Sequence, residues 1–371
     1  MGQHLTCLAG PAGRRDVCRW VQALRCEPEE RGRFKISGMP PSLDRNDPFA
    51  GPNIKRSGLT RFQSPPSLSA PRRRLMQIET VIQQIPAWRN ARAIRHERLN
   101  GGYSNVVHKV FVDEKVYAVR INGEQNRFLE LHNEDEVAVM TLAAKHGISP
   151  PVLEMADRSG VLITEFIDGG TLAVESAKDP RMLARITGLL KRIHQLPYTG
   201  QRRSTPFSLT RGYLRGIAEL GLARPPDLAG FLVEMERIEA ERKKDPDYGT
   251  HYCHNDPFTH NLLEGGDGEL RIIDWELSGL GDIWFDLATV SFSSGFDRRL
   301  DEILLKSYFG HCDEQQLQTL HDMKFVCMVR EIGWALLHTA LEQNRPNPGP
   351  GYMDFALTVL NRLKQGLVTL I

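Results

Sequence analysis

HNDPFTHN, at residues 254–261, is the stretch that decides the fold of this chain. It supplies Asp256 and, five residues later, Asn261, and a second aspartate, Asp274, follows eighteen residues after the first. The short apolar run at residues 270–273 comes after a Gly-rich turn, a pattern typical of a β-strand. A hairpin would carry Asp256 and Asn261 on one side and bring Asp274 back beside them. We therefore expect these three side chains to meet at one site.

The three side chains form the set that phosphoryl transfer needs. We predict Asp256 as the catalytic base, which accepts the proton of an attacking hydroxyl. The amide oxygen of Asn261 and the carboxylate of Asp274 are the predicted ligands of Mg²⁺, which binds the phosphates of ATP. His254 is assigned to the catalytic loop as well. A lone His-x-Asp could be an ordinary turn with a hydrogen-bonded aspartate, but the complete set of spacings favours catalysis.

Three motifs in this region resemble a known family. HxDxxxxN at residues 254–261, IDWE at 273–276 and GDxxxDLA at 281–288 are similar to the choline/ethanolamine kinase family, within the superfamily of aminoglycoside phosphotransferases and protein kinases. The resemblance implies an α+β fold of the bilobal protein-kinase-like type, with a small β-rich N-lobe and a larger helical C-lobe. It also implies that Glu276 contributes to substrate binding or to the outer shell of the metal, and that Asp286 braces the catalytic loop.

A glycine pair precedes these motifs in the chain. Gly101 and Gly102 lie between two runs with strand character, which predicts a hairpin turn whose backbone can approach a phosphate closely. The pattern LxGGxxN also resembles the nucleotide loop of the choline kinase group, so Ser104 and Asn105 are assigned to nucleotide binding with the two glycines.

The next predicted strand, at residues 116–121, carries Arg120 where protein kinases have a lysine. Arginine at this point resembles the bacterial choline-kinase-like group, and a guanidinium can hold two phosphate oxygens at once. Glu136, on the following helix, is the expected partner of Arg120, with Glu130 and Glu134 as alternatives.

The two lobes are expected to meet near residue 168. A buried strand is predicted over residues 161–167, and in the family the segment after it is the hinge where backbone groups meet adenine. Glu165 and Ile167 are therefore assigned to nucleotide binding. The predicted division is a basic, disordered extension at residues 1–75, a nucleotide-binding N-lobe at 76–168 and a catalytic and acceptor-binding C-lobe at 169–371.

The remaining pattern is mainly helical. Helices are predicted over residues 126–145 and from Asp179 to the residue before Pro197, because Asp-Pro is a helix start. Residues 198–250 are predicted as a Pro/Arg-rich loop followed by a charged helix around 231–244. Residues 287–371, at the end of the chain, are expected to be helical.

Composition limits the class of protein. The chain has 371 residues, of which 41% are hydrophobic, and a net charge of +1, so bulk charge gives no support for nucleic-acid binding. Its six cysteines show no metal-binding spacing, which favours reduced thiols in a cytoplasmic protein. No apolar run reaches the roughly 18 residues of a membrane span. Residues 1–75 are rich in Arg, Pro, Gly and Ser, so we expect an extension upstream of an ordered start at Met76.

These observations predict an ATP-dependent phosphotransferase that moves the γ-phosphate to the hydroxyl of a small amino-alcohol, with choline or ethanolamine preferred. Trp334 lies in REIGWALL, which resembles the Trp-bearing helix of choline kinases, and is the predicted contact of the acceptor; ordinary helix core is the alternative. Eukaryotic choline kinases carry an acidic residue soon after GDxxxDLA, where this chain has Ser293. Three other functions stay open: an aminoglycoside or other small-molecule phosphotransferase, a nucleotide-binding pseudokinase, which only Arg120 supports, and a nucleic-acid binder acting through the basic residues 1–75.

Overall fold

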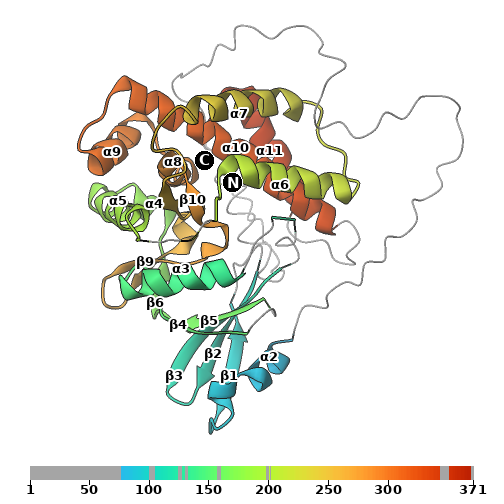
Figure 1. Ribbon diagram of the computed structural model, residues 1–371, viewed down its shortest axis with the longest axis vertical. Helices are drawn as coiled ribbons and strands as arrows, with labels where there is room; N and C mark the ends of the chain where they lie inside the picture. Colours follow the sequence, from blue (N-terminus) through green and yellow to red (C-terminus); the bar gives the residue numbers. More distant parts are fainter. Residues whose placement is uncertain are drawn as a thin grey trace, which may run out of the picture.

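The computed structural model describes residues 77–99, 105–123, 128–129, 133–156, 160–197, 200, 202–342 and 351–368. The expected extension at residues 1–75, the start at Met76 and the predicted phosphate-binding residues Gly101, Gly102 and Ser104 lie outside them. Figure 1 shows a sheet-rich part and a larger helical part, which is the α+β arrangement expected from the sequence.

A five-stranded antiparallel sheet forms the smaller part, in the order β1-β2-β3-β5-β4. Its elements are α2 (Ile78–Gln84), η1 (Pro86–Trp88), β1 (Ile94–Arg98), β2 (Val106–Val112), β3 (Lys115–Ile121), α3 (Asn133–Lys145), β4 (Val152–Ala156) and β5 (Val161–Glu165). In β1 and β2 the residue opposite Arg98 is His108, so the two strands form the predicted antiparallel hairpin.

Side-chain alternation along β3 separates the core from the cleft. Val119 and Ile121 are buried with Trp88 in the apolar cluster beneath α2 and η1. Successive side chains of a strand point to opposite faces, so Ala118 and Arg120 face the other way and line the cleft between the two parts.

The larger part holds two small sheets and most of the helices. Strands β6, β8 and β9 form one sheet, in that spatial order, and β7 pairs with β10 in the other. The elements are β6 (Gly169–Thr171), α4 (Val174–Ala177), α5 (Pro180–His194), α6 (Pro206–Glu219), α7 (Leu228–Arg242), β7 (His251–Cys253), η3 (Thr259–Asn261), β8 (Leu262–Gly265), β9 (Leu270–Ile272), η4 (Trp275–Leu277), β10 (Gly279–Gly281), α8 (Ile283–Ser293), α9 (Arg298–Phe309), α10 (Glu314–Glu342) and α11 (Tyr352–Lys364). Among the described helices, none is long and apolar enough to cross a membrane.

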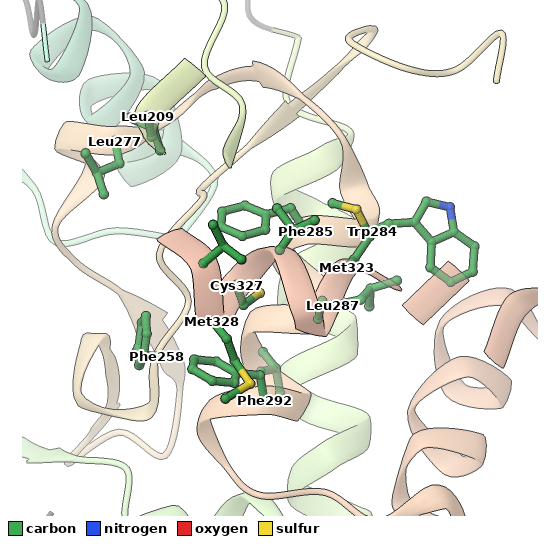
Figure 2. Packing of buried hydrophobic residues seen from close by; sticks show 14 of the residues in the cluster. Leu209, Phe258, Leu277, Trp284, Phe285, Leu287, Phe292, Met323, Cys327 and Met328 are labelled. Carbon is green, nitrogen blue, oxygen red and sulfur yellow. The ribbon is translucent and has the colours of Figure 1, made fainter. Parts of the chain in front are cut away.

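Helix α8 is buried against α10, and this packing supports the catalytic loop. Phe285 and Phe292 of α8 are buried and lie among Met323, Cys327 and Met328 of α10 (Figure 2). Burying each such side chain contributes about 1.5–3 kcal/mol. The two packed helices therefore support the loop of residues 254–261, which they contact through Asp286 and Arg330.

The helix predicted to start at Asp179 is confirmed. The Asp179 carboxylate accepts hydrogen bonds from the backbone N–H groups of Arg181 and Met182, and α5 follows with proline at its first position.

The prediction of a loop after residue 198 is wrong, because that segment contains α6. The Thr205 side chain accepts a hydrogen bond from the backbone N–H of Ser208, whose hydroxyl accepts one from the backbone N–H of Thr205. Pro206 then occupies the first position of the helix, where its missing N–H has no cost. The surrounding Pro and Arg residues obscured this capping signal in the sequence.

The helix expected from residue 126 is shorter within the described residues. α3 begins at Asn133, and Phe128 and Leu129 lie outside it. Phe128 packs so closely on α6 that a Cβ added to Gly216 would lie 2.8 Å from its ring. This contact joins the two parts of the molecule.

Candidate active site

The loop after β7 is anchored through its backbone. The Asp286 carboxylate, on α8, accepts hydrogen bonds from the backbone N–H groups of His254 (2.8 Å) and Asn255 (2.7 Å). Asn255 has a φ of 65°, in the left-handed region that non-glycine residues rarely adopt. Its side-chain amide donates to the carbonyls of Ser204 and Leu277. Asp286 therefore takes the bracing position that the family resemblance implies.

His194 of α5 supports Asp286 from the other side. Its Nε2 lies 3.0 Å from Asp286 Oδ2, and its Nδ1 lies 2.5 Å from the Tyr308 hydroxyl. His194 is 4% exposed, so this contact belongs to the core beneath the loop.

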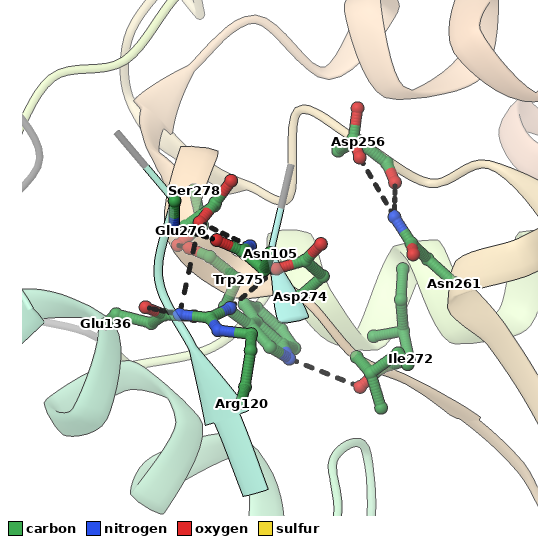
Figure 3. A network of polar contacts seen from close by, with 12 residues as sticks. Asn105, Arg120, Glu136, Asp256, Asn261, Ile272, Asp274, Trp275, Glu276 and Ser278 are labelled. Atoms are coloured by element: carbon green, nitrogen blue, oxygen red, sulfur yellow. Dashed lines mark hydrogen bonds and ion pairs between the residues drawn. The ribbon is translucent and has the colours of Figure 1, made fainter. Parts of the chain in front are cut away.

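Asp256 is held at the centre of the site by two side chains. Asn261 Nδ2 donates to Asp256 Oδ2 at 2.9 Å, and Arg330 Nη2 donates to Asp256 Oδ1 at 2.9 Å. The Asn261 amide also donates to the backbone carbonyl of Asp256 (Figure 3). The carboxylate therefore has one preferred orientation, and its side chain, 17% exposed, still reaches the cleft.

Both ring nitrogens of His254 face backbone groups. Nε2 lies 3.0 Å from the carbonyl of Ile273, and Nδ1 accepts the backbone N–H of Asp256 at 3.3 Å. Burial lowers the pKa of His254, so the ring is neutral at pH 7. A neutral ring with both nitrogens engaged favours a positioning role for His254 over proton transfer.

Asp274 is brought to the cleft by the β8–β9 hairpin and lies close to Arg120. Arg120 Nη1 donates to Asp274 Oδ1 at 2.6 Å, and Nη2 donates to Glu136 Oε2 at 2.5 Å (Figure 3). Burial opposes the charge of Arg120, but Glu136 and Asp274 outweigh it, so the pKa of Arg120 lies above its ordinary value. Glu136 is thus the partner of this arginine that the sequence predicted; of the two alternatives, Glu130 lies outside the described residues.

Glu276 lies on the same side of the cleft. Its Oε2 accepts a hydrogen bond from Asn105 Nδ2 at 2.9 Å and lies 4.0 Å from Arg120 Nη2. Asn105 Oδ1 accepts the backbone N–H of Gly123 at 3.0 Å. Burial raises the pKa of Glu276. Glu276, which was predicted to bind the substrate, thus contacts Asn105 and Arg120, which were predicted to bind the nucleotide.

One cleft of about 480 Å³ runs between the two parts of the molecule. Its sheet-side wall is apolar and includes Val107, Ala118 and Leu162, with Glu165 and Ile167 at the connection between the parts. The predicted residues that line it are Asn105, Arg120, Glu165, Ile167, Asp256, Asn261, Asp274, Glu276 and Trp334.

Aromatic side chains form the other end of the cleft. The ring of Trp334, on α10, has its centroid 5.4 Å from that of Tyr352 and 6.2 Å from that of Phe355, both on α11. Phe258, beside Asp256 in the catalytic loop, lines the same cleft. Ser293, where the resemblance would place an acidic residue, is 3% exposed and does not line it.

Sequence reasoning missed three residues that line this end: Tyr213, Arg330 and Glu331. Arg330 and Glu331 are adjacent charged residues in the otherwise apolar middle of α10, and both are at most 5% exposed. Buried charges require partners, so a charged pair inside an apolar helix pattern was the signal that could have identified them.

The donor atoms near Asp274 suit a hard cation. Asn261 uses its amide nitrogen on Asp256, which leaves Oδ1 as its remaining polar atom. Asp274 uses Oδ1 on Arg120, and its side chain is 30% exposed on the cleft. An amide oxygen and a carboxylate oxygen are ligands that Mg²⁺ prefers.

A kinase-like sheet over a helical part, with two aspartates and an amide in the cleft between them, is the arrangement of a small-molecule phosphotransferase. The chain belongs to the phosphotransferase enzyme family, which matches residues 95–323, more than half of its length.

Similar proteins support this assignment. Protein LicA of Haemophilus influenzae is 25% identical over 224 residues, which are 58% of this chain and 79% of that protein. A choline/ethanolamine kinase family protein from Mesorhizobium loti has a TM-score of 0.62 at 24% identity, over 78% of this chain and 94% of that one. Choline kinase LicA from Streptococcus pneumoniae has a TM-score of 0.59 at 22% identity, over 72% and 93%. At these identities the two structures show a shared fold.

Proposed function

We propose that this protein transfers the γ-phosphate of ATP to the hydroxyl of a small amino-alcohol, choline or ethanolamine. The observation that carries the proposal is the position of Asp256, an oriented carboxylate between the Asp274 side of the cleft and an aromatic end formed by Trp334, Tyr352 and Phe355. A fold alone does not decide the acceptor, since kinase-like phosphotransferases act on many alcohols.

The nucleotide is proposed to occupy the sheet side of the cleft. Val107, Ala118 and Leu162 offer an apolar surface for the adenine, and the segment of Glu165 and Ile167 lies where the base would meet backbone groups. Arg120 is the buried cation nearest to Asp274 and would bind the phosphates.

Asn261 and Asp274 are the proposed ligands of Mg²⁺. Bound there, the ion would neutralise charge on the phosphates during transfer. Glu136 holds Arg120 from the opposite side, so the arginine stays in place when Asp274 binds the metal.

Asp256 orients the acceptor and takes its proton. The hydroxyl would donate a hydrogen bond to the carboxylate, and the proton would pass to Asp256 as the bond to phosphorus forms. Arg330 and Asn261 each donate to one oxygen of this carboxylate, which holds it in one orientation. The anchoring of the loop by Asp286 preserves this geometry.

The aromatic end favours a compact, cationic head group. A trimethylammonium cannot donate N–H hydrogen bonds, and each aromatic face that it meets contributes about 0.5–2 kcal/mol. The names of the two similar solved structures, a choline/ethanolamine kinase family protein and a choline kinase, support the same acceptor. An aminoglycoside would need several acidic groups in a wide groove, whereas Asp256 and Glu331 are the described carboxylates at this end of the cleft.

The experiment that tests the proposal is a comparison of acceptors. The full-length protein, with ATP and Mg²⁺, is offered choline, ethanolamine and kanamycin separately, and ADP release is measured against a blank without acceptor. We expect kcat/KM for choline or ethanolamine to exceed that for kanamycin. A kcat/KM for kanamycin above the values for both choline and ethanolamine would indicate an aminoglycoside phosphotransferase. Nucleotide binding without any turnover would indicate a pseudokinase.

Three free thiols in the described residues, Cys253, Cys312 and Cys327, are in keeping with the cytoplasmic location that we propose for an ATP-dependent enzyme.

A further inference from the structure

One buried carboxylate in the cleft has no role in the mechanism above. Glu331, on α10, is 5% exposed and lines the aromatic end of the cleft. Its Oε1 lies 3.2 Å from Arg330 Nε, but the two atoms do not have hydrogen-bond geometry. Within the part of the chain that the structure describes, Oε1 accepts no hydrogen bond. Beyond its ion pair with Arg330, this buried oxygen therefore keeps an unused capacity to bind a further partner.

The neighbouring charges favour a cation as that partner. Arg330 is shared, because its Nη2 donates to the oxygen of Asp256 at 2.9 Å while Nε faces Glu331. One guanidinium therefore stands against two carboxylates, and the cluster holds an excess negative charge when both are ionised. Burial raises the pKa of Glu331 to about 7, so the protein without ligand relieves part of this excess by binding a proton.

The surroundings indicate the kind of cation. Trp334 lies three residues after Glu331, so the two side chains share a face of α10. Tyr352 and Phe355 pack edge-on against the Trp334 ring and line the same cleft. Aromatic faces beside a single carboxylate suit a bulky organic ammonium, which combines apolar surface with a positive charge.

We propose that Glu331 is the specificity-determining carboxylate of this enzyme, which receives the ammonium group of the acceptor while Asp256 receives its hydroxyl. The inference rests on the proposed amino-alcohol function. Glu331 and Asp256 contact neighbouring nitrogens, Nε and Nη2, of the same guanidinium, so a short amino-alcohol can reach both carboxylates. The ammonium then replaces the proton on Glu331, and the positive charge of Arg330 remains available to Asp256.

The test compares a charged acceptor with a neutral one of the same shape. Choline and dimethylbutanol, in which a tert-butyl group replaces the trimethylammonium, are offered to wild type and Glu331→Gln with saturating ATP and Mg²⁺. We expect Glu331→Gln to lower kcat/KM for choline about 10-fold or more, because it removes one partner of a desolvated charge pair. The value for dimethylbutanol and the KM for ATP should stay within about 2-fold. If dimethylbutanol is not phosphorylated, its competitive inhibition constant serves instead.

Two further variants separate a role in binding from a role in folding. Glu331→Asp keeps the charge and should recover part of the choline preference. Glu314→Gln, on the same helix but exposed and paired with Arg298, should behave as wild type. Equal losses for choline and dimethylbutanol in Glu331→Gln, or no loss for either, would overturn the inference while leaving the proposed function intact. A wild-type protein that phosphorylates neither choline nor ethanolamine would overturn both.

Discussion

Two buried arginines, Arg120 and Arg330, hold the two aspartates that we propose for catalysis from opposite sides of the cleft. Arg120 on β3 contacts Asp274, and Arg330 on α10 contacts Asp256. Each arginine also has a glutamate beside it on a helix.

The two glutamates differ in a way that reflects function. Glu136 accepts a hydrogen bond from Arg120 and does not line the cleft, whereas Glu331 lacks such a bond and does line it. In the proposed mechanism, the first glutamate fixes its arginine for the nucleotide, and the second is available for the acceptor. We therefore propose that the same pair of residue types serves once as a structural support and once as a binding site.

The largest effect should come from Asp256→Asn. The amide cannot accept the hydroxyl proton, so kcat should fall by about 10²–10⁴-fold. ATP affinity, measured by titration calorimetry, should be unchanged because the Arg120 side of the cleft is intact. If the variant keeps more than about a tenth of the wild-type rate, Asp256 is not the catalytic base.

Asp274→Ala and Asn261→Ala should next affect the metal. Each removes one proposed oxygen ligand, so the Mg²⁺ concentration for half-maximal rate should rise and kcat should fall. Asp274→Ala should be the more damaging because it also removes a charge. Magnesium titrations that match wild type for both variants would contradict the assigned ligands.

Arg120→Met and Arg330→Met compare the two sides directly. Each leaves buried carboxylates without their cation, so each should lower the free energy of unfolding by about 3 kcal/mol. Their kinetic effects should diverge: Arg120→Met should chiefly raise the KM for ATP, and Arg330→Met should chiefly lower kcat and raise the KM for the acceptor. If the two variants change kcat and the two KM values in the same way, the cleft does not have separate nucleotide and acceptor sides.

Trp334→Ala should have a smaller effect, confined to the acceptor. Loss of one aromatic face costs about 1–2 kcal/mol, so the acceptor KM should rise about 5–30-fold with little change in the KM for ATP. Leu317→Ala, on the same helix but away from the cleft, serves as the control. If the two KM values rise equally, Trp334 is ordinary helix core.

The smallest effect is expected for a truncated chain that begins at Met76. Residues 1–75 carry no predicted catalytic or binding residue, so kcat/KM and the melting temperature should match those of the full chain. A fall of many degrees in melting temperature would show that the extension packs on the catalytic part.

Local spacing made half of the site predictable. Asp256, Asn261 and Asp274 lie within one hairpin-forming segment, so sequence spacing alone brings them together. The strand that carries Arg120 was predicted from alternation. The 2.6 Å contact of Arg120 with Asp274 was not, because it joins residues 154 positions apart across two parts of the molecule.

The acceptor side was harder to predict for the same reason. Arg330 reaches Asp256 from a helix 74 positions further along the chain. Tyr213 comes from α6, a helix whose capping signal was obscured by neighbouring Pro and Arg residues. Long-range contacts of this kind depend on how helices pack, and no local pattern encodes them.

The central claim, transfer of phosphate to an amino-alcohol, is tested most directly by identifying the product. The full-length protein is incubated with ATP, Mg²⁺ and either choline or ethanolamine, and the acceptor is analysed by mass spectrometry while ADP is quantified in the same sample. We predict a phosphorylated acceptor in amounts equal to the ADP formed, and neither product above background with Asp256→Asn. ADP that accumulates without a phosphorylated acceptor would contradict the claim.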